Sequence, residues 1–140
     1  MARDQKLDLL RSVPLFSGLG DGEIRRLGEL VDEVDLPAGR VLMTQGEHGA
    51  EMLIMVDGAA SVVRDGQSLD DCGPGSILGE ISLLDGGPRT ATVTLTAPSR
   101  LLILARREFH SLMDEFPEVR MRVLETVARR LRTLEPSAIC

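Results

Sequence analysis

The spacing of hydrophobic residues changes twice along the chain. Between residues 5 and 35, apolar positions recur three and four residues apart, which predicts two short helices. From residue 36 to 105, short apolar runs alternate with Gly, Pro and Asp turn signals, as in antiparallel sandwiches and barrels. From residue 106 to about 135, the helical spacing returns. The pattern therefore predicts a single α+β, mainly β, domain over residues 1–140, with an antiparallel β unit between two helical ends.

Turn signals refine the predicted β unit. Two Asp-Gly pairs, Asp57-Gly58 and Asp65-Gly66, predict tight turns, because glycine tolerates a positive φ. Residues 90–96 alternate threonines with apolar residues, so this strand should bury one face and leave the other polar.

Charge and composition narrow the possible ligands. The chain holds 16 Lys and Arg against 22 Asp and Glu, a formal charge of −6. Proteins that bind nucleic acid usually carry a basic excess, so direct nucleic-acid binding is not expected. Aromatic residues make up 2% of the chain, with neither Trp nor Tyr, so any ligand must be held mostly by polar groups.

The cysteines and histidines give no sign of a metal site. Cys72 and Cys140, like His48 and His110, stand far apart in the sequence. No spacing is typical of metal ligands or of a disulfide framework, so we expect neither. The N-terminus has no apolar run long enough for a signal peptide, and no window is long enough for a membrane span. We therefore expect a cytoplasmic protein that does not cross a membrane.

Residues 73–91 combine glycines, a short apolar turn and one arginine. Gly79 permits a close backbone approach, and the turn that begins near Ile81 can present backbone N–H groups to an anion. Arg89 follows at the start of the alternating strand, where its guanidinium can hold two phosphate oxygens. Glu80 is repelled by such an anion unless its carboxylate accepts a hydrogen bond from a ligand hydroxyl. The alternative is a structural ion pair between Glu80 and Arg89.

Two stretches of this segment resemble a known motif, LGEISLL at residues 78–84 and PRTATV at residues 88–93. They look like the phosphate-binding cassette of cyclic nucleotide-binding domains, the family of catabolite activator proteins and protein kinase A regulatory subunits. Further similar stretches stand in family order at residues 13–16, 36–39 and 52–58. The resemblance implies a β-roll, a jelly-roll-like antiparallel barrel with helices before and after it, over most of the chain.

The resemblance also implies the ligand, cAMP or cGMP, with no separate cofactor. It implies that Glu80 accepts a hydrogen bond from the ribose 2′-hydroxyl and that Arg89 pairs with the cyclic phosphate. The other ligand contacts that it implies lie in the same two stretches: Gly79, Ile81, Ser82, Thr90 and Ala91. Leu78 stands where the family usually has Phe, and Ser82 where it often has Ala. Backbone contacts dominate at both positions, so neither change should remove a ligand contact.

The base preference stays open from the sequence. Thr90 resembles sites that favour cGMP, but hydroxyl residues also occur at this position in cAMP sites. In the family the base often meets a side chain of the final helix, which makes four residues candidates: Thr126, Arg129, Arg130 and Thr133.

Together these features favour a non-enzymatic cyclic-nucleotide sensor whose C-terminal helix responds to the ligand. Catalysis is not expected, because no nucleophile with a neighbouring base is found. The chain ends soon after its last predicted helix, so we expect no DNA-binding domain and a separate, unidentified effector protein. The alternative is an interaction module that keeps the fold but has lost the ligand; the presence of both Glu80 and Arg89 argues against it.

Two features of the predicted final helix allow more than one interpretation. Its arginines can form a solvated face or a movable lid near the anionic ligand. Leu124 and Leu131 lie seven residues apart, with Val127 and Leu134 offset from them. This spacing fits either a homodimer through the helix or packing of the helix on the β-roll.

Overall fold

The computed structural model describes residues 2–134, so Cys140 lies outside the described residues. The chain divides into two compact units. The first, which we call the helical unit, contains the residues up to Glu29 and those from His110 onward; the second, the β unit, is Leu30–Phe109. A single domain over residues 1–140 therefore stays a prediction.

The order of elements along the chain is helical, then β, then helical. The helical segments are α1 (Arg3–Arg11), η1 (Pro14–Phe16), α2 (Asp21–Leu30), α3 (Ser82–Asp85), α4 (Arg106–Glu115) and α5 (Glu118–Leu134). The strands are β1 (Asp32–Leu36), β2 (Val41–Met43), β3 (Glu51–Asp57), β4 (Ala60–Arg64), β5 (Gln67–Cys72), β6 (Ile77–Leu78), β7 (Thr92–Leu95) and β8 (Ser99–Ala105).

In the helical unit, the two N-terminal helices predicted from the sequence are present. Helix α1 buries Leu7 and Leu10, and α2 buries Ile24 and Leu27, which matches their helical spacing. Pro14 starts the short segment η1, which contacts α5 within the same unit.

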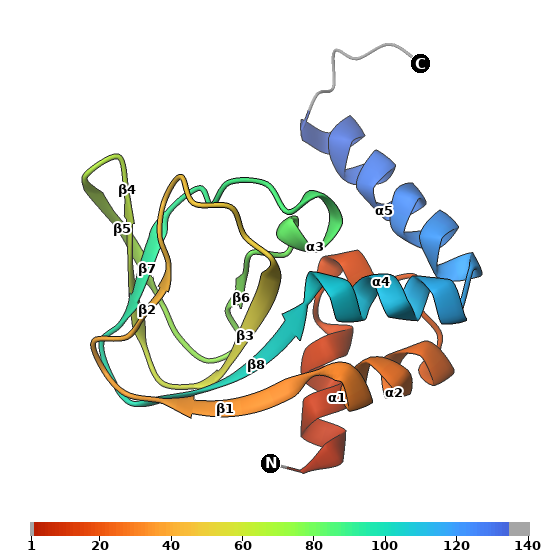
Figure 1. The fold of residues 1–140 in the computed structure, drawn as a ribbon, viewed down its shortest axis with the longest axis horizontal. Helices are drawn as coiled ribbons and strands as arrows, with labels where there is room; N and C mark the ends of the chain where they lie inside the picture. The colour runs from red at the N-terminus through yellow and green to blue at the C-terminus, as the bar shows by residue number, and fades with distance from the viewer. Residues whose placement is uncertain (1, 135–140) are drawn as a thin grey trace. The chain divides into compact units, whose positions relative to one another are not determined.

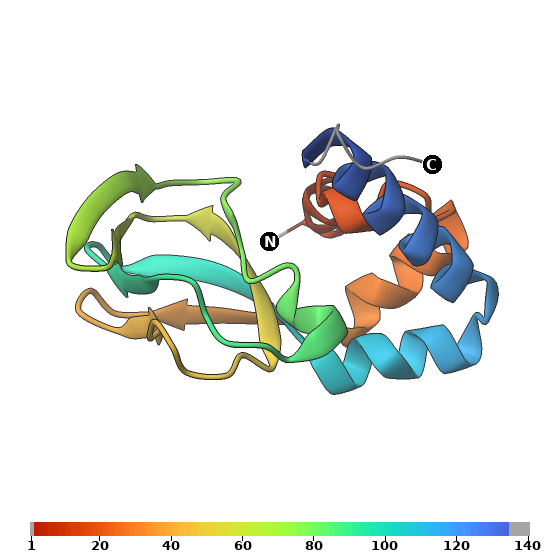
Figure 2. The ribbon, with the colours of Figure 1, turned by 90° about the horizontal axis from the view of Figure 1, so that it is seen from above.

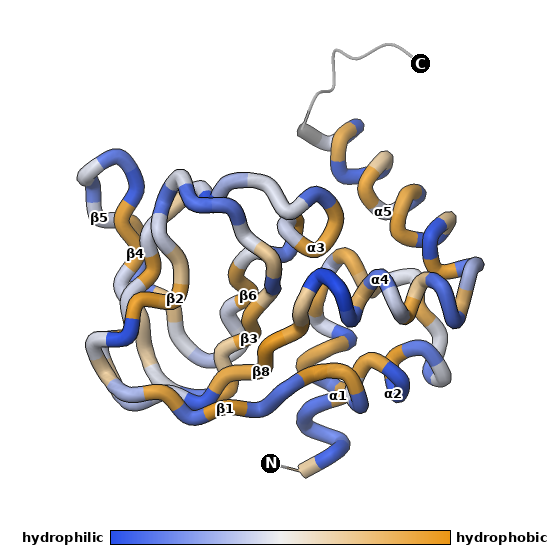
Figure 3. Tube along the Cα trace, in the orientation of Figure 1, coloured by the Kyte–Doolittle hydropathy of each residue, from blue (hydrophilic) through white to orange (hydrophobic). Residues whose placement is uncertain are grey.

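The β unit consists of two four-stranded antiparallel sheets, with the strand orders β1-β8-β3-β6 and β2-β7-β4-β5 (Figures 1 and 2). Hydrophobic stretches run along β3 and β8 (Figure 3). The core cluster of the unit draws on both sheets: Met43, Leu53, Met55, Ala60, Val93, Leu95 and Leu101. This architecture confirms the predicted mainly β roll.

The backbone confirms the tight hairpin turn predicted at residues 65–66, but the hairpin predicted at residues 57–58 is wrong, because β3 and β4 lie in different sheets. Asp65 and Gly66 both have positive φ, 51° and 76°, as a two-residue hairpin turn between twisted strands requires. Gly58 has a φ of 117°, and a Cβ there would lie 2.8 Å from the Cα of Ser99. Only glycine therefore fits where β3 turns into β4 beside Ser99.

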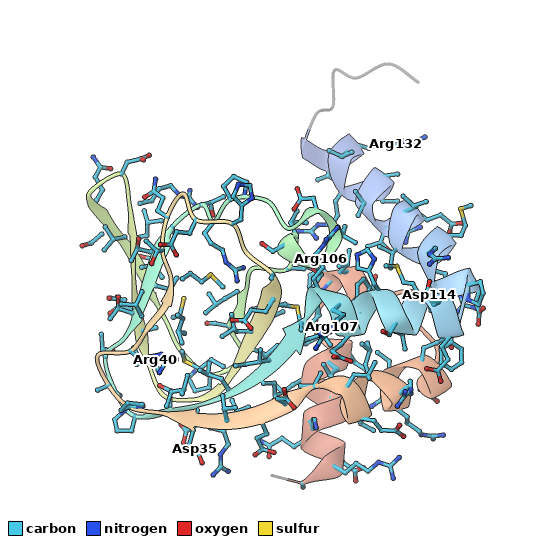
Figure 4. The ribbon with its side chains drawn as sticks, in the orientation of Figure 1. Asp35, Arg40, Arg106, Arg107, Asp114 and Arg132 are labelled. Atoms are coloured by element: carbon cyan, nitrogen blue, oxygen red, sulfur yellow. The ribbon has the colours of Figure 1, made fainter. Side chains whose placement is uncertain are left out.

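The start of the sheet differs from the sequence prediction. Strand β1 begins at Asp32, inside the segment 5–35 for which helices were predicted. Its sequence, DEVDL, has no run of apolar residues, and it is fixed by antiparallel pairing with β8. Across this pair, Arg100 Nε lies 2.9 Å from Asp35 Oδ1, and the hydrogen bond holds the pKa of the Asp35 carboxyl below its usual value. Figure 4 labels Asp35 on β1.

Candidate functional site

The β unit contains a cavity of about 950 Å³. It is lined by the segment that the sequence singled out and by residues of the β4–β5 hairpin. The residues predicted from the sequence to contact a ligand all line this cavity: Gly79, Glu80, Ile81, Ser82, Arg89, Thr90 and Ala91. The fold thus brings together residues that are up to twelve positions apart in the chain, in one concave surface.

Arg89 is the most buried charged group of this cavity, with 8% of its surface exposed. Its Nη1 donates hydrogen bonds to the backbone carbonyl of Glu51 at 2.9 Å and to the hydroxyl of Ser82 at 3.2 Å. Its backbone is fixed as well, because its N–H donates to the carbonyl of Glu47 at 2.7 Å. The side chain is therefore held within the cavity wall and does not turn out into solvent.

The guanidinium of Arg89 has no salt bridge among residues 2–134, so the ion pair with Glu80 that the sequence left open is not formed there. Burial lowers the pKa of Arg89 below its ordinary value, while the nearby carboxylate of Glu51 acts in the opposite direction. Arginine nevertheless stays protonated near neutral pH. A cation that has been removed from water without a salt-bridge partner attracts an anion into the cavity.

The guanidinium of Arg89 has room in this position because two of its neighbours are glycines, which have no side chain. A Cβ at Gly79, whose φ is 72°, would overlap Arg89 Nη1, so the close approach predicted at this glycine is observed. A Cβ at Gly49 would lie 2.6 Å from Nη1 and closer still to Cζ and Nε. Gly49 could not be selected from the sequence, because its pairing with the segment after α3 is a tertiary contact. The N–H of Gly49 donates to the carbonyl of Gly87 at 2.9 Å.

The predicted apolar turn is helix α3, a single turn that begins at Ser82. The N–H of Ser82 donates to the carbonyl of Gly79 at 3.1 Å, and that of Leu83 to the carbonyl of Glu80 at 3.3 Å. Some of the N–H groups expected to face an anion are therefore engaged in closing the turn. The C-terminal end of α3 is held by Arg106, whose Nη2 donates to the carbonyl of Leu84 at 3.0 Å (Figure 4).

The β4–β5 hairpin contributes lining residues that could not be selected from the sequence. Val62 and Leu69 face each other across β4 and β5 and supply apolar surface. Arg64 and Asp70 supply a positive and a negative charge on the same hairpin. Strand alternation places Val62 and Arg64 on one face, but the sequence did not show that this face lines the site.

The four base-contact candidates lie on α5 in the helical unit. Thr126 is buried there, and its hydroxyl donates to the carbonyl of Arg122 at 2.9 Å. The hydroxyl of Thr133 donates to the carbonyl of Arg129 at 3.2 Å. Contact of these residues with the base stays a prediction.

The described residues also bear on whether the chain could hold a metal ion or cross a membrane. Among residues 2–134, no group of three or more His, Cys, Asp or Glu side chains could hold a metal ion. In that part of the chain, none of the helices combines the length and the hydrophobicity that a transmembrane segment needs.

The β unit is a β-roll that contains a cavity, and similar proteins identify its family. The family described as the cyclic nucleotide-binding domain matches residues 33–116, more than half of the chain. A CRP-like cAMP-activated global transcriptional regulator of Mycobacterium tuberculosis is 31% identical over 130 residues, covering 89% of this chain and 58% of the relative. A cyclic nucleotide-gated potassium channel of Mesorhizobium japonicum is 34% identical over 79% of this chain and 31% of the channel.

Solved structures agree with this assignment. The N-terminal domain of a transcriptional regulator from Streptomyces coelicolor has a TM-score of 0.82 and 34% identity, with 94% of both chains covered. The regulatory domain of Toxoplasma gondii PKA with cAMP has a TM-score of 0.70 and 28% identity, with 79% of this chain and 44% of that one covered. This chain belongs to the cyclic nucleotide-binding domain family. It spans less than two thirds of the length of the Mycobacterium regulator that it resembles.

Proposed function

We propose that this chain is a non-enzymatic sensor that binds cAMP or cGMP in the cavity of its β unit. The observation that carries the proposal is the guanidinium of Arg89, which is 8% exposed, lines the cavity and has no salt bridge within residues 2–134. A cyclic phosphate would supply the missing negative charge. Its two exocyclic oxygens match the two parallel donors of a guanidinium.

The same cavity can hold the sugar. Glu80 lines it and is half-buried, so its carboxylate can accept a hydrogen bond from a ribose 2′-hydroxyl. Such a bond offsets the repulsion between a carboxylate and a nearby phosphate. No step of bond making or breaking is assigned to these residues, because each role is to hold the ligand.

A thermal-shift titration with cAMP, cGMP and 5′-AMP tests the proposal. A ligand that binds only the folded protein stabilises it by about 2.7 kcal/mol at a hundredfold excess over Kd. We expect at least one cyclic nucleotide to raise the melting temperature. The open 5′-phosphate carries more negative charge beside Glu80, so 5′-AMP should give a smaller shift. If neither cyclic nucleotide shifts the transition, the alternative of an interaction module without a ligand is favoured.

The role of Glu80 has its own test. Glu80→Gln should weaken the binding of a ribonucleoside cyclic phosphate by about tenfold, because it replaces a charged acceptor of the 2′-hydroxyl with a neutral one. The 2′-deoxy analogue lacks this hydroxyl and should lose much less affinity. Calorimetry with both ligands on wild type and variant gives the comparison. Equal losses for the two ligands would contradict the hydroxyl contact.

We also propose that the chain forms a homodimer through α5 and responds to the ligand as this dimer. Helix α5 exposes three large apolar side chains, Met121, Leu124 and Leu131, to 59%, 60% and 53%. Together with Ala128, these residues follow the alternating three- and four-residue spacing of a coiled-coil seam. Hydrophobic positions along α5 are visible in Figure 3. Val127 is half-buried, and the side chain of Leu134 lies outside the described residues, so Met121 and Ala128 replace them in the proposed seam.

Sedimentation equilibrium tests this homodimer. The wild-type chain should sediment as a dimer, and the double variant Leu124→Gln, Leu131→Gln should sediment as a monomer, because two large apolar contacts are lost from each copy. Glu125→Gln changes an exposed neighbour outside the seam and should leave the dimer intact. A monomeric wild type at high concentration would rule the seam out.

A further inference from the structure

Arg106 places a second guanidinium beside the phosphate-binding segment of the β unit. It is the first residue of α4, where Figure 4 labels it, and it is half-buried. Its Nη2 donates to the carbonyl of Leu84 at 3.0 Å, and its backbone N–H donates to the carbonyl of Ala50 at 2.7 Å. Arg106 therefore joins the carboxyl end of α3 to the residue that precedes β3.

Arg89 connects the same two segments as Arg106. Its Nη1 donates to the carbonyl of Glu51, the first residue of β3, and to the hydroxyl of Ser82, the first residue of α3. A guanidinium has five N–H donors, so these two bonds use both N–H groups of Nη1 and leave Nε and Nη2 as a pair for a phosphate. The place of this pair depends on where Glu51 and Ser82 lie, and Arg106 fixes the segments that contain them.

Arg106 is a costly side chain for a purely structural contact. Among residues 2–134, its buried Nε has no hydrogen-bond partner and its guanidinium has no salt bridge. A buried donor without an acceptor and a half-buried charge without a counter-charge both lower the stability of a fold. A neutral side chain of similar length would avoid both costs. Stability alone is therefore a poor explanation for an arginine at this position.

We propose that Arg106 is a positioning residue for the cyclic nucleotide, because it holds α3 where Ser82 can orient Arg89. This role rests on the proposed binding of a cyclic nucleotide. An arginine fork meets two phosphate oxygens only when its direction is fixed, and a misplacement of about 1 Å weakens such an interaction strongly. Without the bond to the Leu84 carbonyl, the end of α3 is released from the start of α4. Arg89 then loses its orientation although its own side chain is unchanged.

Arg106→Met tests this role, with Arg107→Met as the matched control at the next, exposed position (Figure 4). By calorimetry with cAMP and cGMP, Arg106→Met should raise the Kd of the nucleotide that binds by about tenfold. The melting temperature without nucleotide should shift by less than about 4 °C, because a hydrogen bond and a buried charge are removed together. Arg107→Met should change neither quantity. Arg106→Lys keeps a cationic donor for the Leu84 carbonyl and should recover most of the affinity.

The route through Ser82 is tested by a double-mutant cycle. Ser82→Ala removes the hydroxyl that accepts from Arg89 but keeps the backbone N–H, so it should weaken binding by about threefold. In the double variant with Arg106→Met, the loss should be clearly smaller than the product of the two single losses, because both changes act on the orientation of Arg89. Single losses that multiply in full would overturn this route.

The outcomes separate this role from the sensor proposal. Nucleotide binding by the wild type with a Kd that Arg106→Met does not change would overturn the positioning role and leave the sensor proposal intact. An Arg106→Met variant that does not fold, or that melts far below the wild type, would show that Arg106 is a structural anchor and also overturn the role. Failure of the wild-type chain to bind either nucleotide would overturn the sensor proposal and, with it, the role of Arg106.

Discussion

Arg89→Met should weaken cyclic-nucleotide binding by about a hundredfold while leaving the folded protein nearly as stable as the wild type. The loss in affinity follows from removing two charge-assisted hydrogen bonds to the phosphate, each worth about 1.5–3 kcal/mol. The small effect on stability follows from the cost of burying the guanidinium, which the lowered pKa of Arg89 reflects. Methionine has a similar length and no charge to bury.

Calorimetry measures the binding, and chemical denaturation of the ligand-free protein measures the stability. We expect the free energy of unfolding to change by about 1 kcal/mol or less, because the bonds from Arg89 to Glu51 and Ser82 are lost along with the buried charge. Arg40→Met removes an exposed arginine and should change neither quantity. Unchanged affinity together with a large loss of stability would mean that Arg89 is a structural group.

Gly49→Ala should produce a comparable loss of affinity without touching the chemistry of the arginine. The new methyl group would lie 2.6 Å from Nη1 of Arg89 and still closer to its Cζ. The guanidinium is the end of a flexible side chain, so it must move away from its position in the cavity wall. We expect binding to fall by about tenfold or more, because a displaced fork no longer meets both phosphate oxygens.

Gly73→Ala is the matched control, since a Cβ at Gly73 would meet no atom within 4 Å and neither glycine has a positive φ. It should leave the affinity unchanged. A double variant, Gly49→Ala with Arg89→Met, should bind no more weakly than Arg89→Met alone, because the methyl group acts through the guanidinium. Additive losses in the double variant would show that Gly49 affects binding by another route.

Much of the fold could be predicted because its signals are local. The Asp-Gly turn at residues 65–66 and the alternation around β7 report on the conformation of a few neighbouring residues, and the structure confirms both. Strand β1 could not be predicted in the same way. Its DEVDL sequence has little strand propensity, and its conformation follows from antiparallel pairing with β8, which lies far away in the sequence.

The same distinction between local and long-range signals applies to the residues of the site. Residues within the cassette could be selected from one continuous segment, and all of them line the cavity. Gly49, Arg64 and Asp70 come from other elements, and their places depend on sheet pairing and on a bulge between β4 and β5. Neither a long-range pairing nor a one-residue bulge leaves a periodic signal in the sequence.

The most direct measurement of the central claim is a crystal structure of the chain grown with saturating cyclic nucleotide. We expect a phosphate with both exocyclic oxygens about 3 Å from the guanidinium of Arg89, and the ribose 2′-hydroxyl at the same distance from the Glu80 carboxylate. A nucleotide bound with its phosphate away from Arg89, or a cavity that stays empty while Arg89 keeps its bond to the Glu51 carbonyl, would contradict it.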